Sequence, residues 1–142
     1  MKKNYFLLAL SLLTLSLFPQ NAYGDEMWST EEYNVIYEED RNNTAIWSYN
    51  NRAGYLFIHG LAGEYYNRES YNGYWTQESS SLRCDTYREG INGERSYHWG
   101  RFEITFIDPD FPSRWQGKFG LCDGETTITI NGIPFFGDNI NY

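Results

Sequence analysis

Short runs in which apolar and polar residues alternate recur along the chain, and each run ends at Asn, Gly, Asp or Ser. The clearest is residues 101–107, in which Phe102, Ile104 and Phe106 fall on one face. A period of two is typical of a β-strand with one buried face. No segment after residue 24 shows the 3.6-residue period of an amphipathic helix. The pattern therefore predicts an all-β protein.

Strands this short, spaced about every ten residues and joined by tight turns, predict a β-meander. Asn131-Gly132 is the strongest turn signal, and Gly60 and Gly63 interrupt the pattern in the first half. A meander closes as an up-and-down barrel or packs as a β-sandwich. We favour the single small antiparallel barrel, because closure removes exposed strand edges. The expected strands are residues 33–37, 44–49, 55–59, 71–77, 82–87, 101–107, 114–122, 126–130 and 133–136.

The first 24 residues have the three parts of a secretory signal peptide. Lys2 and Lys3 precede an apolar run over residues 6–18, and Ala22-Tyr23-Gly24 supplies the small residues of a cleavage site before Asp25. The run is shorter than the roughly 20 residues of a membrane-spanning helix. We expect cleavage to leave residues 25–142 as one secreted or periplasmic domain with no transmembrane segment, and the short Lys-initiated signal indicates a bacterial source.

Two cysteines follow, Cys84 and Cys122, and the chain has no others. Disulfides form and persist in exported proteins. We therefore expect a single Cys84–Cys122 disulfide that ties together the two ends of the second half of the chain.

The chain is acidic, with a net charge of −8 that becomes −10 when residues 1–24, with two Lys and no acid, are removed. Binding to nucleic acid requires a basic face that neutralises phosphates, and anionic lipid heads likewise attract basic segments. The charge therefore argues against both partners and fits neutral or cationic ones.

Aromatic residues make up 19% of the chain, including 13 Tyr and 5 Trp. They exceed what a domain of this size needs for its core, and aromatic rings stack on sugars and flat ligands. We therefore expect a non-enzymatic binding protein for a small amphipathic ligand or a glycan. The alternatives are an extracellular protein-interaction module or enzyme inhibitor, and a small hydrolase. The candidate binding residues are Trp47, Tyr55, Tyr74, Trp75, Trp99, Arg101 and Trp115.

Three phrases place a glycine beside bulky rings: YNGYW at 71–75, WGRF at 99–102 and WQGKFG at 115–120. This rhythm resembles that of small secreted β-meander proteins, including the avidin and lipocalin barrels. The order of the phrases relative to the two cysteines is also similar to that of secreted bacterial proteins of unassigned role. The resemblance implies a barrel around a ligand cup and implies no activity.

Residue types that carry catalysis or bind metals are present but lack the necessary spacing. His59 and His98 lie far apart in sequence, and no His-x-His or His-Glu-x-x-His motif occurs. The acid clusters at 38–40 and 108–110 have neither calcium-loop spacing nor a defined carboxylate pair. The serines at 79–81 lack a Gly-x-Ser-x-Gly elbow. The sequence therefore predicts no catalytic residue, no metal site and no cofactor.

Overall fold

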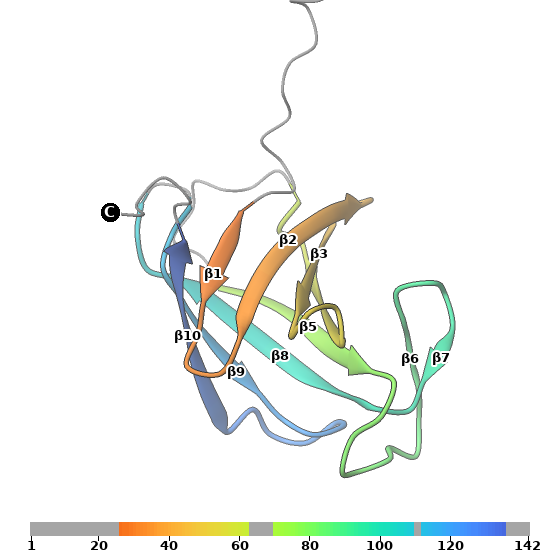
Figure 1. Ribbon diagram of the computed structural model, residues 1–142. Coiled ribbons are helices and arrows are strands. Elements are labelled where there is room, and N and C mark those ends of the chain that lie inside the picture. Colours follow the sequence, from red (N-terminus) through yellow and green to blue (C-terminus); the bar gives the residue numbers. More distant parts are fainter. Residues whose placement is uncertain (1–25, 63–69, 110–111, 136–142) are drawn as a thin grey trace, which may run out of the picture.

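The computed structural model describes residues 26–62, 70–109 and 112–135, which form an all-β structure without a helix (Figure 1). Eight strands close into an antiparallel barrel in the order β1-β10-β9-β8-β5-β4-β3-β2, and β6 and β7 pair only with each other. The expected barrel is thus confirmed. The strands are β1 Met27–Ser29, β2 Asn34–Arg41, β3 Thr44–Tyr49, β4 Gly54–His59, β5 Ser70–Gln77, β6 Arg88–Glu89, β7 Arg95–Ser96, β8 Trp99–Phe106, β9 Trp115–Phe119 and β10 Ile128–Phe135.

The barrel closes through its shortest wall strand. In β1, Trp28 pairs with Val35 of β2 on one side and with Pro134 of β10 on the other. The sequence pattern does not predict this strand, because three residues are too few to show alternation. Its position nevertheless joins the first and last parts of the described chain and leaves the eight-stranded sheet without a free edge.

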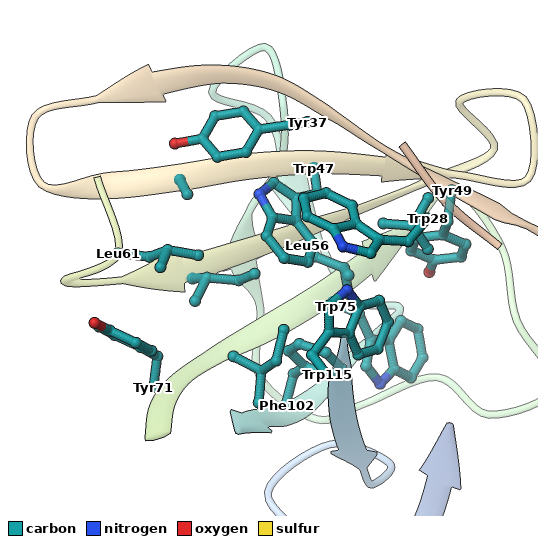
Figure 2. Close-up of a cluster of buried hydrophobic side chains, with 14 of the residues drawn as sticks. Trp28, Tyr37, Trp47, Tyr49, Leu56, Leu61, Tyr71, Trp75, Phe102 and Trp115 are labelled. Carbon is teal, nitrogen blue, oxygen red and sulfur yellow. The ribbon is translucent and has the colours of Figure 1, made fainter. Parts of the chain in front are cut away.

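Inward-facing aromatic side chains fill the middle of the barrel (Figure 2). The indole rings of Trp28 and Trp47 stack with centroids 4.4 Å apart, and Trp115 lies 5.8 Å from Trp47. The Trp28 indole N–H donates to the Ser113 carbonyl at 2.9 Å. Within the described residues, the indole nitrogens of Trp47 and Trp115 are buried without a hydrogen-bond partner. The core therefore depends on ring packing more than on polar contacts.

The predicted turn at Asn131-Gly132 is wrong, because β10 runs through both residues. Gly132 is opposite Trp115 in the neighbouring strand. A Cβ at Gly132 would lie 2.1 Å from the indole Cε2 of Trp115. The glycine is therefore required by a ring that lies across the strand, not by a turn.

The predicted strand at 82–87 is also wrong, since the chain forms no strand between Gln77 and Arg88. This segment lies outside the barrel wall. Its Cys84 is joined to Cys122 beyond the end of β9, which confirms the expected disulfide. The chain then returns through the β6–β7 hairpin, which Figure 1 shows at the side of the barrel. The predicted signal peptide at 1–24, Gly63, Asp110 and Phe136 lie outside the described residues.

Candidate functional site

A pocket of about 260 Å³ opens into the barrel at one end, where the β1–β2, β3–β4, β5–β8 and β9–β10 connections lie. We call it the end pocket. Successive strands of a barrel contribute alternate side chains to the lumen, so the pocket wall comes from almost every strand. Its lining residues are Tyr33, Val35, Tyr49, Leu56, Trp75, Gln77, Ser80, Ser81, Phe102, Trp115, Phe119, Leu121 and Ile130.

Of the residues that the structure describes, none with a charged side chain lines the end pocket, and the polar groups there are few. The Gln77 Nε2 donates to the Tyr49 hydroxyl at 2.9 Å. The Tyr49 ring in turn stacks on Tyr33, with centroids 5.2 Å apart. The pocket therefore combines an apolar body with one oriented polar group, the arrangement typical of small-molecule sites.

The two phenols of the pocket are held in their neutral form. Burial raises the pKa of Tyr49 above the ordinary tyrosine value. Burial, followed by the charge of Glu32, raises the pKa of Tyr33. Both phenols therefore ionise less readily than a free tyrosine and bring no charge into the lumen. The Tyr49 hydroxyl donates to the Thr76 carbonyl at 3.5 Å and accepts from Gln77.

The pocket mouth is fastened on one side by the long β5–β8 connection. The disulfide joins Cys84 of this connection to Cys122 of the β9–β10 loop, with Cα atoms 5.6 Å apart. Beside it, the indole N–H of Trp75 donates to the Gly120 carbonyl at 2.8 Å. These two links hold the loops that carry Ser80, Ser81 and Leu121 against the rim.

Three of the seven predicted binding residues point into the barrel. Trp75 and Trp115 line the end pocket. Trp47 lies in the core and packs against Trp115. The prediction that tryptophans would surround a lumen thus agrees with their positions, while their role in binding stays a prediction.

The other four predicted residues, Tyr55, Tyr74, Trp99 and Arg101, lie on the outer face of the barrel wall. The Tyr74 ring stacks on Phe57 at 4.8 Å, and its hydroxyl donates to the carbonyl of Glu89 in the β6–β7 hairpin. The Trp99 indole N–H donates to the Thr86 carbonyl, and the Arg88 guanidinium lies 3.8 Å from the Trp99 ring. Tyr74 and Trp99 therefore hold the hairpin against the wall.

Two pocket residues that were not among the predicted binding residues, Tyr49 and Gln77, could have been identified from the alternation of side chains along a strand. Tyr49 lies two residues after Trp47 in β3, and Gln77 lies two residues after Trp75 in β5. Positions i and i+2 of a strand share a face. Once a tryptophan is assigned to the lumen, this rule assigns both neighbours to it as well.

The acid and histidine candidates are occupied elsewhere or lie apart. The Glu38 carboxylate accepts hydrogen bonds from Arg52 at 3.0 Å and from Ser48 at 2.7 Å, and the Arg52 contact lowers its pKa. Asp108 forms an ion pair with Arg114 at 2.9 Å. His59 and His98 lie at opposite ends of the barrel. In the described ranges, no group of three or more His, Cys, Asp or Glu side chains comes together to hold a metal ion.

Fold and pocket together define a closed eight-stranded antiparallel barrel with a cup at one end. No family model, no curated protein and no solved structure matches the chain. Among the described residues, there is no helix of the length and apolarity needed to cross a membrane.

Proposed function

We propose that this chain is an exported, non-enzymatic binding protein that holds a small uncharged amphipathic molecule in the end pocket. The observation that carries the proposal is the pocket itself. A barrel whose middle is packed by three tryptophans keeps an opening of about 260 Å³ at one end, close to the lower limit of about 300 Å³ for typical ligand sites.

The pocket wall defines the chemistry of the ligand. A charged group placed there would lose its hydration without finding a counter-ion among the lining residues, which is costly. Aromatic walls at Trp75, Phe102 and Phe119 suit a flat or branched apolar body. The Gln77 amide and the Tyr49 hydroxyl suit one hydroxyl or carbonyl on that body.

Export supports the same function, because a binding protein outside the cytoplasm meets ligands from the surroundings. The disulfide fits an oxidising compartment. Mass spectrometry of the protein from the culture fluid or periplasm tests this part. We expect the measured mass to be that of a chain that starts at Asp25, less the mass of the two hydrogen atoms lost when the disulfide forms.

Binding is tested with tryptophan fluorescence and thermal shift against a panel of naphthols, indoles and medium-chain alcohols, each beside its carboxylate counterpart. We expect the uncharged compounds to bind and their carboxylates to bind at least about tenfold more weakly. A panel in which nothing binds, or in which the charged members bind as well, overturns the proposal.

Two loop serines provide a matched pair of variants. Ser81 is exposed on the pocket rim, whereas Ser79 is exposed in the same connection but does not line the pocket. Ser81→Phe should narrow the mouth and weaken every ligand, while Ser79→Phe should bind like the wild type. Equal effects of the two variants would place the ligand elsewhere.

A further inference from the structure

A second hollow, of about 560 Å³, lies on the outside of the barrel between the wall and the β6–β7 hairpin, and we call it the hairpin groove. Tyr55 and Thr76, which are paired across β4 and β5, contribute from the wall. The groove shares only Gln77 with the end pocket. Its lining residues are Arg52, Ala53, Tyr55, Thr76, Gln77, Glu78, Arg83, Ile91, Asn92, Glu94, Arg95, Ser96, Tyr97 and His98.

The hairpin groove gathers cations on a protein that is acidic as a whole. Of its three arginines, Arg52 is paired with Glu38. Arg83 and Arg95 form no ion pair with an acidic side chain in the part of the chain that the structure describes. Of the two groove carboxylates, that of Glu94 accepts the Asn92 backbone N–H at 2.8 Å and so closes the hairpin tip. Glu78 is exposed at the groove margin.

Both unpaired guanidinium groups lie over aromatic rings. Arg83 lies 4.0 Å from the centroid of the Tyr97 ring, and Arg95 lies 4.7 Å from that of Tyr87. Stacking uses the flat face of a guanidinium and leaves its N–H edge available. That edge matches the two oxygens of a carboxylate or the oxygens of a sulfate. The rings thus orient the two cations and leave their hydrogen-bond donors for an anion.

The rest of the groove suits hydroxyl-rich ligands. The Tyr55 and Tyr97 hydroxyls and the Asn92 amide form no side-chain hydrogen bond with another described residue. His98 uses its Nδ1 with Ser80 at 2.9 Å, and its second ring nitrogen is left for a ligand. Tyrosine faces also pack against the apolar faces of sugar rings. A peptide would instead seek a strand edge. The closed barrel presents none on this wall, and the free edges of β6 and β7 are only two residues long.

We propose that the hairpin groove is a second binding site, for a short oligosaccharide that carries a carboxylate or sulfate group, with Arg83 and Arg95 holding the anion. The proposal is independent of the end pocket, because the two hollows have opposite chemistry and nearly separate linings. It assigns the glycan partner to the outside of the barrel and the uncharged ligand to the inside.

Calorimetric titration of the full mature chain tests the proposal with four probes: a trimer of glucuronic acid, the matching neutral glucose trimer, a sulfated glucose trimer and a Glu-rich hexapeptide. We expect at least one anionic trimer to bind, the neutral trimer to bind at least about tenfold more weakly, and added salt to weaken the anionic complex. The two anionic trimers distinguish carboxylate from sulfate. No binding by either anionic trimer, equal binding of the neutral one, or tighter binding of the hexapeptide overturns the proposal.

Arg83→Gln and Arg95→Gln should each weaken the anionic trimer by about tenfold, the usual effect of losing a hydrogen bond to a charged group. Lys118→Gln is the control, because it removes the same charge from an exposed position on β9 outside the groove. Thermal unfolding verifies that all three variants fold. If Arg83→Gln and Arg95→Gln lose no more affinity than Lys118→Gln, the net charge of the protein explains the losses and contacts in the groove do not.

Ser81→Phe, which narrows the mouth of the end pocket, should leave the affinity for the anionic trimer unchanged. Failure of binding at one site is therefore distinguishable from failure at the other.

Discussion

Single glycines decide how closely neighbouring strands and rings approach in this barrel. At Gly73 in β5, an added Cβ would lie 1.7 Å from the backbone carbonyl oxygen of Phe57. A flexible side chain could move away from such a contact, but a backbone carbonyl in a paired strand cannot move without disturbing the ladder. The glycine in the 71–75 phrase is therefore a packing requirement of the wall.

We predict that Gly73→Ala destabilises the protein by at least about 2 kcal/mol, within the range for overpacked sites. Urea unfolding followed by tryptophan fluorescence measures the loss. Asn72→Ala is the control, since Asn72 is the exposed neighbour in the same strand, and it should change the free energy of unfolding by less than about 0.5 kcal/mol. Equal effects of the two substitutions would show that the wall adjusts to the extra methyl group.

At the scale of elements, the β6–β7 hairpin belongs to the long β5–β8 connection and lies outside a barrel that closes without it. Three side chains of the wall donate hydrogen bonds to backbone carbonyls of this connection: Tyr74 to Glu89, Trp99 to Thr86, and at the hairpin tip Arg41 to Ile91 at 2.7 Å. The disulfide fastens the start of this connection to the β9–β10 loop. The hairpin and the pocket rim therefore depend on the same covalent link.

We predict that replacing both cysteines by serine lowers the free energy of unfolding by about 2–4 kcal/mol, the usual contribution of one disulfide. Hydrogen exchange of the native variant should show faster exchange at residues 82–98 than in the wild type, while β3, β4 and β5 keep their protection. Faster exchange spread evenly over the barrel strands would show instead that the link stabilises the whole wall.

Strand alternation explains how much of this arrangement could be predicted from the sequence. It located β2, β5, β8 and β9, which have a buried inner face and more exposed positions between. The strands β3 and β4 were found instead as short, largely apolar runs between turn residues. Alternation also indicates which face of the sheet each side chain occupies. Trp99 is three residues from the inward-facing Phe102 and therefore faces outward. The return of the hairpin over Trp99 and Tyr74 is a long-range contact, which local alternation does not encode.

In the whole molecule, the end pocket and the hairpin groove differ in the chemistry of their lining residues. The lumen is packed with indoles at its middle and uncharged at its open end, whereas the outer groove collects arginines. The segment 77–81 lies between them. Its Gln77 lines both hollows, and its Ser80 lines the end pocket while its hydroxyl contacts His98 of the groove at 2.9 Å. One short segment thus separates an apolar environment from an ionic one.

The stability of the whole molecule should decline in alkaline solution, because tyrosines of the pocket and of the wall resist ionisation in the folded state. Burial, followed by the Glu89 charge, raises the pKa of Tyr74 to about 12, and burial raises those of Tyr33 and Tyr49. An unfolded tyrosine loses its proton near pH 10. Between pH 10 and 12 the unfolded chain therefore binds fewer protons than the folded one, and stability falls as the pH rises.

We predict that Tyr74→Phe makes this alkaline decline shallower, as measured by urea unfolding at pH 8, 10 and 11.5, because the variant lacks one phenol whose ionisation the fold opposes. Asn72→Ala is the control, because it changes an exposed neighbour in the same strand without removing an ionisable group, and it should keep the wild-type slope. Tyrosinate absorbance of the folded protein provides a second measurement. In an alkaline titration, the Tyr74→Phe variant should show less of the late absorbance increase than the wild type. A wild-type free energy of unfolding that stays constant up to pH 11.5 would show that water reaches these phenols in the folded protein and would contradict their burial.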